Sequence, residues 1–257
     1  MLLTHRPGPA LAPYVEGLWY CDEYQPVQRH EHVLPTGRFQ IVIDLSAGPG
    51  AVAGLHSRCI VIEPTAIQML MGVVFRPGGA RGFFDEPAGD FYNQVVPFDL
   101  TWGPSVLRLR DRLRDAPVRQ KFDTLEAALL AVVERSGDKR RVLHQAVRYA
   151  LHEFRRSPHI RTVGDVGKEA GLSRRRLGQL FREQVGMTPK LYCRLIRFRQ
   201  VVREIHAGDA VDWAEVALAG GYYDQAHLTH EFRDFSGFSP GRFLSAERPH
   251  VNHVAVE

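Results

Sequence analysis

The sequence has few cysteines and no long apolar run. Its three cysteines, Cys21, Cys59 and Cys193, lie far apart and in no paired spacing, which argues against a disulfide framework and against a zinc site of the CxxC kind. No apolar stretch reaches the roughly 18 residues that a membrane-spanning helix needs. The first twenty residues contain several prolines and no basic segment followed by an apolar run, so a signal peptide is not expected. These absences predict a protein of the reducing cytoplasm that does not bind membranes.

The first part of the chain also lacks an excess of either charge. Residues 1–154 contain 17 Lys and Arg against 17 Asp and Glu, whereas residues 155–248 contain 16 against 11. A neutral half joined to a basic half is typical of a sensor joined to a polyanion binder. A basic surface that is merely solvated is the alternative, and charge alone does not exclude it.

No convincing set of residues supplies a nucleophile with its base or a metal site. In His30-Glu31-His32 the two histidines would share one side of a strand and could be metal ligands. We favour an exposed polar strand edge, because no third or fourth possible ligand lies at a spacing that is typical of a metal site. The segment Arg76–Arg81 lacks the motif of a phosphate-binding loop and predicts a tight turn. The sequence thus predicts no enzyme, no cofactor and no metal; the alternative is a metal-dependent, cupin-like enzyme with an accessory helical domain.

Short strand-like runs dominate the first 75 residues, and Pro- and Gly-containing turns bound them. They are Val15–Cys21, Arg38–Leu45, Arg58–Glu63 and Ile67–Phe75. Such strands at close spacing predict a small antiparallel barrel or sandwich. Apolar residues at helical spacing then predict two helices within 104–135, which pack on the sheet or on a second subunit. The polar segment 136–141 is the expected boundary between a β-rich domain, 1–138, and an all-α domain, 139–247, so the predicted fold class is α+β.

One pattern occurs twice in the second half of the chain, and its two copies lie 51 residues apart. A repeat of this length usually marks a supersecondary unit that is used twice. A long amphipathic helix that begins at Pro189 and ends at 206–209 would separate the copies. The matching residues are Leu177, Phe181, Arg182 and Gly186–Pro189 in the first copy, and Leu228, Phe232, Arg233 and Gly237–Pro240 in the second.

The first copy has the start and stop signals of a helix-turn-helix. Thr162 begins one helix, Gly171 ends it, and Ser173 caps the next helix, about 173–184. Leu177, Leu180, Phe181 and Val185 form the inner stripe of that second helix. Arginine and glutamine on its outer face suit a DNA major groove, because Arg pairs bidentately with guanine and Gln with adenine. The outer face consists of Arg175, Gly178, Gln179 and Arg182, with Arg174 beside it.

The second copy repeats the scaffold with different outward residues. Asp224 caps its second helix, about 224–235. Arg233 takes the position of Arg182 in the first copy, which suits a shared phosphate contact. Since the first face is arginine-rich and the second presents Ala, Thr and His, we expect the first copy to hold DNA more strongly. The outward residues of the second helix are Ala226, Thr229, His230 and Arg233, with Gln225 and His227 at its N-terminal end.

Residues 145–245 closely resemble the DNA-binding domain of the AraC/XylS family of bacterial transcription regulators. The matching motifs are Ala170–Ser173, Leu177 with Phe181, Gly186–Pro189, Val216-Ala217, Gly221-Tyr222, Phe232-Arg233 and Gly237–Pro240. The resemblance implies two recognition helices in successive major-groove segments of double-stranded DNA. It also implies a small-molecule effector at the N-terminal domain, a homodimer through the helices of 104–135, and RNA polymerase as a partner if the protein is an activator.

By this resemblance individual residues acquire expected roles on DNA. Base-facing positions are Arg175, Gly178 and Gln179 in the first helix and Gln225, Ala226, His227, Thr229 and His230 in the second. Arg174, Arg176, Arg182 and Arg233 are expected to contact phosphates or to flank the base contacts.

Three departures from the family pattern modify these expectations. Gly167 stands where alanine is usual, at a helix cost of roughly 1 kcal/mol. Gly178 and Ala226 have no long side chain, so they offer only close approach or a thymine-methyl contact. The histidines of the second helix stand where arginine is common, which predicts an affinity that depends on pH near neutrality.

Overall fold

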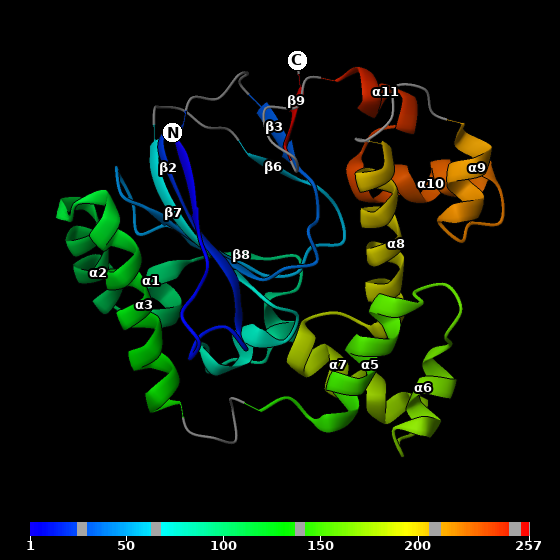
Figure 1. Ribbon diagram of the computed structural model, residues 1–257, viewed down its shortest axis with the longest axis horizontal. Coiled ribbons are helices and arrows are strands. Elements are labelled where there is room, and N and C mark those ends of the chain that lie inside the picture. Colours follow the sequence, from blue (N-terminus) through cyan, green and yellow to red (C-terminus); the bar gives the residue numbers. More distant parts are fainter. Residues whose placement is uncertain (25–29, 63–67, 137–141, 206–211, 247–252, 257) are drawn as a thin grey trace.

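The computed structural model describes residues 1–24, 30–62, 68–136, 142–205, 212–246 and 253–256. A β-rich N-terminal part is followed by a helical C-terminal part (Figure 1). The α+β class expected from the sequence is therefore confirmed. The boundary expected at 136–141 lies almost wholly outside the described residues, as does the expected helix end at 206–209.

A six-stranded antiparallel sheet forms most of the N-terminal part, in the order β1-β2-β7-β4-β5-β8. Along β4, Ile41 and Ile43 are buried while their neighbours are only partly so, as the alternation of side chains in a strand requires. Gly72 of β7 pairs with Trp19 of β2, and a Cβ at Gly72 would lie 2.2 Å from the indole. Glycine is therefore needed for this close approach. The strands are β1 (Leu2–His5), β2 (Val15–Tyr24), β4 (Gln40–Asp44), β5 (Ala51–Ala53), β7 (Gln68–Phe75) and β8 (Val95–Pro97).

A second sheet has three antiparallel strands, β6 (Ile60–Ile62), β3 (His30–Val33) and β9 (His253–Val256). Strand β3 lies between the other two, and Glu31 at its centre is fully buried. The exposed polar edge expected at His30–His32 is therefore wrong, because β9 from the end of the chain covers β3 (Figure 1). Within the described residues neither sheet closes into a barrel.

Helix α3 (Val118–Arg135) packs on the large sheet, one of the two placements that the sequence allows, and α2 (Ser105–Asp115) packs on α3. Lys121 of α3 lies over the Tyr20 ring at 5.6 Å, and the Phe122 ring stacks on His5 at 4.9 Å. The buried ammonium of Lys121 donates to the carbonyls of Leu113 and Arg114, which lie in the last turn of the preceding helix. The remaining elements of this part are η1 (Gly79–Gly82), η2 (Ala88–Phe91), α1 (Phe98–Trp102), α2 (Ser105–Asp115) and α3 (Val118–Arg135).

The C-terminal part consists of short helices grouped around one long helix, α8 (Figure 1). Helix α5 begins after His144, whose side chain caps it, and Val142 before it is exposed. No helix among the described residues has the length and apolar character to cross a membrane. The helices are α5 (Gln145–Arg156), α6 (Val163–Glu169), α7 (Arg174–Val185), α8 (Pro189–Ile205), α9 (Trp213–Ala219), α10 (Gln225–Ser236) and α11 (Pro240–Ser245).

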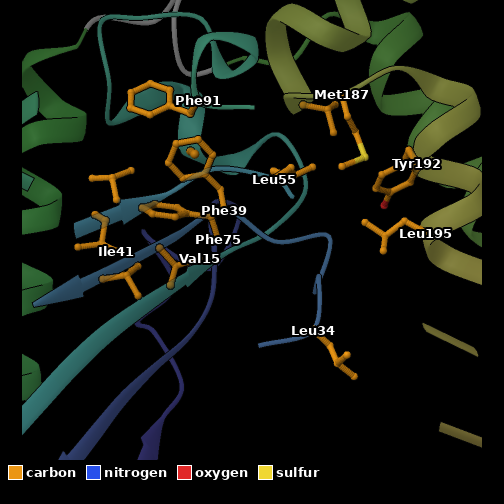
Figure 2. Close-up of a cluster of buried hydrophobic side chains, with 14 of the residues drawn as sticks. Val15, Leu34, Phe39, Ile41, Leu55, Phe75, Phe91, Met187, Tyr192 and Leu195 are labelled. Carbon is orange, nitrogen blue, oxygen red and sulfur yellow. The ribbon is translucent and has the colours of Figure 1, made fainter. Parts of the chain in front are cut away.

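The buried apolar core is continuous between the two parts. Figure 2 shows Met187, Tyr192 and Leu195 of the helical part on the side that faces Leu55 and Leu34 of the β-rich part. Tyr192 is fully buried, and this burial raises its pKa to about 12. Because one core includes residues of both parts, the N-terminal part packs directly against the helices that contain the repeat.

Candidate nucleic-acid interface

The first repeat folds as a helix-turn-helix of α6 and α7. The Thr162 hydroxyl accepts from the backbone N–H of Asp165 at 3.1 Å, which caps α6. Gly171 then takes a left-handed φ of 71°, a conformation that glycine adopts without steric cost. The Ser173 hydroxyl accepts from the N–H of Arg176 at 3.2 Å and begins α7. The three signals expected from the sequence are confirmed.

The second repeat builds the same unit from α9 and α10. Asp212 caps α9 through the N–H of Ala214 at 2.9 Å, and Asp224 caps α10 through the N–H of His227 at 2.7 Å. Gly221 has the same φ of 71° as Gly171. Each recognition helix thus begins with an acceptor that orders its first turn.

The turns of the two units differ by one residue. The left-handed glycines, Gly171 and Gly221, lie 50 residues apart, whereas the caps, Ser173 and Asp224, lie 51 apart. The additional residue of the second turn is Tyr223, whose exposed fraction is 88%. The constant spacing of 51 therefore holds for the recognition helices but not for the helices that precede them.

The outer faces of α7 and α10 have the exposure that a binding face requires. A Cβ at Gly178 would meet no atom within 4 Å, so this position also opens to solvent. Leu177, Phe181, Leu228 and Phe232 on the opposite faces are fully buried. Exposed residues of α7 are Arg174, Arg175, Arg176, Gln179 and Arg182; those of α10 are Gln225, Ala226, His227, His230 and Arg233, with Thr229 and Gly178 half-buried.

The N-terminal part touches the C-terminal end of α7. The Arg81 guanidinium pairs with Glu183 at 3.0 Å. A Cβ at Gly186, which ends α7 with a φ of 106°, would lie 3.1 Å from the Ala88 carbonyl oxygen. Arg182 lies against Gly89 in the same loop. The contact therefore involves the end of the recognition helix and leaves the outer face of its first two turns exposed.

The end of α10 is held in a similar way by the small sheet. The Cys59 N–H donates to the Phe235 carbonyl at 2.8 Å, and the His32 ring lies 4.9 Å from the Phe238 ring. Gly237, the repeat partner of Gly186, lies beside both Cys59 and His32. Equivalent ends of the two recognition helices thus contact the same N-terminal part.

His32, one of the two histidines singled out from the sequence, serves this contact. His32 Nδ1 lies 3.5 Å from Cys59 Sγ, and burial raises the pKa of the Cys59 thiol, which keeps it protonated. No group of three or more His, Cys, Asp or Glu in the described part of the chain is arranged to hold a metal ion. The structure gives His32 a packing role against the second helix-turn-helix.

Comparison with known families agrees with this geometry. Residues 166–246 match a family described as a helix-turn-helix domain, and residues 3–97 match a domain of unknown function (DUF6597). No curated protein matches the chain.

Solved structures of ToxT from Vibrio cholerae are similar over most of the chain. One covers 95% of this chain and 97% of its own at 10% identity, with a TM-score of 0.40. ToxT bound to (E)-4-(8-methylnaphthalen-1-yl)but-3-enoic acid has 9% identity, the same two coverages and a TM-score of 0.44. These TM-scores describe a weak likeness.

The C-terminal part is an AraC-type helix-turn-helix domain, as its motifs, its two capped units and its family match agree. The chain that carries it is a DNA-binding transcription regulator.

Proposed function

We propose that the protein reads two successive major-groove segments of double-stranded DNA with α7 and α10. The main observation that supports this proposal is that both helices expose the same outward positions and begin at a side-chain cap. They are also joined through a single helix, α8. Helix N-terminal residues are the ones that contact base edges in this motif. A shared support keeps two such faces at a fixed separation, which reading of adjacent segments requires.

Base contacts are assigned to long polar side chains on these faces. In α7 these are Arg175 and Gln179, and in α10 they are Gln225 and His230, all exposed. Gly178 and Ala226 allow close approach of the helix to the groove, while His227 and Thr229 complete the second face. Arg174, Arg176, Arg182 and Arg233 are assigned to phosphates, which fix position without carrying sequence information.

The N-terminal part is proposed to control this reading. Its contacts with the ends of α7 and α10, at Gly186 and Gly237, support a coupling between its conformation and the orientation of both helices. A small-molecule effector that binds this part would act through these contacts. A homodimer through α2 and α3, and a contact with RNA polymerase if the protein activates transcription, complete the proposal.

Selection of binding sites from random duplexes, followed by affinity measurements, tests the assignment. Arg175→Ala should cost about 1–3 kcal/mol and relax base preference at one position of the selected site. Arg182→Ala should weaken binding to all sequences alike and lower the salt slope by about one unit.

The matched control is Arg6→Ala, which removes an exposed arginine next to β1, outside both recognition helices and outside α2 and α3. It should leave affinity and salt slope unchanged apart from a small loss of general attraction. Wild-type binding by both the Arg175 and Arg182 variants would show that α7 does not enter the groove.

A further inference from the structure

A buried carboxylate connects the second recognition helix to α8. Glu231 of α10 is 3% exposed. Its Oε2 accepts from Nε of Arg194 at 2.8 Å, and its two oxygens accept from Nη2 of Arg197 at 3.3 and 3.4 Å. Both arginines belong to α8 and lie 37 and 34 residues before Glu231, so the carboxylate connects α10 to α8.

The same two arginines also contact the rest of the second unit. Arg197 donates to the carbonyl of Gly221 in the turn at 3.2 Å, and its guanidinium lies 5.0 Å from the centre of the Tyr222 ring. Arg194 donates to Asp234 at 3.1 Å and lies 5.4 Å from the centre of the Phe235 ring. Hydrogen bonds and ion pairs thus attach both the turn and the recognition helix to α8.

The equivalent position of the first unit is apolar. The repeat partner of Glu231 is Leu180, which is buried and apolar. The partner of Asp234 is Glu183, and its ion pair is with Arg81 of the N-terminal part. Contact between α7 and α8 runs through rings such as Phe181 and Tyr192, whose centres are 5.5 Å apart.

This difference has a physical consequence for orientation. Apolar side chains stabilise contact without strong directional preference, whereas hydrogen-bonded ion pairs are satisfied in one geometry only. A buried ion pair costs desolvation, and well-packed apolar residues would often give equal stability. Its best-attested use is to fix a register, as a single polar residue does in a coiled coil.

We propose that Glu231, held by Arg194 and Arg197, is the positioning residue that fixes the orientation of α10 on α8. It thereby sets the spacing between the two DNA segments that the protein reads. This inference rests on the proposed function, namely that α7 and α10 both enter the groove. Glu231 itself faces α8 and contacts no DNA.

The test measures affinity for a selected site and for versions with one base pair added to or removed from between its two segments. One base pair rotates the second segment by about a tenth of a helical turn, so the wild type should bind the altered sites about tenfold more weakly. Glu231→Leu, which copies the residue of the first repeat, should bind all spacings within about threefold of one another. A structural role alone would change stability without changing this preference.

Two further variants keep the test decisive. Arg194→Met leaves Arg197 to neutralise Glu231, so it tests the bridge if Glu231→Leu does not fold, and it should also weaken the spacing preference. Glu215→Gln removes an exposed acid from α9 in the same unit and should behave as wild type. Folded variants at Glu231 or Arg194 that keep the wild-type preference would overturn the inference alone, whereas a wild type without any spacing preference would overturn the two-helix reading as well.

Discussion

Replacing Gly178 by alanine should stabilise the protein and weaken its binding to DNA. Gly178 lies in the interior of α7, where glycine is less favourable than alanine by about 1 kcal/mol. A Cβ at this position would meet no atom within 4 Å, so no packing cost offsets the gain. A gain of about 1 kcal/mol raises the unfolding midpoint of a chain of this size by about 2–4 °C.

The effect on DNA should have the opposite sign. If Gly178 faces the groove as proposed, the added methyl separates the helix from the base edges. We expect a loss of about 1–3 kcal/mol at the selected site, similar to one mismatched base pair, and little change for unrelated duplexes. Thermal and urea denaturation followed by circular dichroism measure the first effect, and fluorescence anisotropy with labelled duplexes measures the second.

Gly171→Ala is the matched control for this experiment. A Cβ at Gly171 also meets no atom within 4 Å, but its φ of 71° is left-handed, which costs an L-residue about 1–2 kcal/mol. Gly171→Ala should therefore lower the unfolding midpoint. If Gly178→Ala lowered the midpoint as well, Gly178 would not lie in the interior of a regular α7 helix with open space around its Cβ. Unchanged affinity in a stabilised variant would remove Gly178 from the groove.

Two other expectations concern stability. Asp224→Ala and Ser173→Ala each remove the cap of a recognition helix and should cost about 1 kcal/mol in urea denaturation, and a variant as stable as the wild type would show that the N–H groups find other acceptors. Phe232→Ala removes a fully buried ring that packs against Phe198 and Phe243 and should cost about 3–5 kcal/mol, whereas truncating the exposed Tyr223 should change stability by under about 0.5 kcal/mol, so equal losses would contradict the burial of Phe232.

The features that sequence reasoning predicted correctly are local ones. A cap is a bond between residues three apart, as between Ser173 and Arg176, and a left-handed glycine such as Gly171 needs no distant partner. The inner stripes of α7 and α10 follow from the helical period alone. These signals are complete within about twenty residues, which is why both helix-turn-helix units could be placed from the sequence.

The features that were missed depend on residues far apart in the chain. Whether β3 is an edge or a centre depends on β9, which lies more than 200 residues further along the chain. Glu231 takes the position of Leu180 in the inner stripe of the first repeat, which indicates burial, but the two arginines that hold it lie on α8, 34 and 37 residues away. The contacts at Gly186 and Gly237 likewise join segments that no periodic pattern relates.

Gly167 shows how the two repeats differ beneath a similar pattern. A Cβ at Gly167 would lie 3.0 Å from the Leu172 carbonyl oxygen and 3.7 Å from the backbone nitrogen of Arg174, the first residue of α7. The equivalent residue of the second unit is Ala217, which is fully buried. The second turn contains the additional residue Tyr223, so α10 begins one residue later than α7 does.

The glycine at 167 is therefore explained by the shorter turn of the first unit, which brings the start of α7 close to α6. What appears in the sequence as a departure with a helix cost of roughly 1 kcal/mol avoids a contact that would be tighter than most Cβ contacts. The second unit has a longer turn and an alanine, and it is attached to α8 by the ion pairs of Glu231 instead. The ion pairs to α8 therefore occur in the unit with the longer turn, whereas α7, after the shorter turn, packs on α8 through rings such as Phe181 and Tyr192.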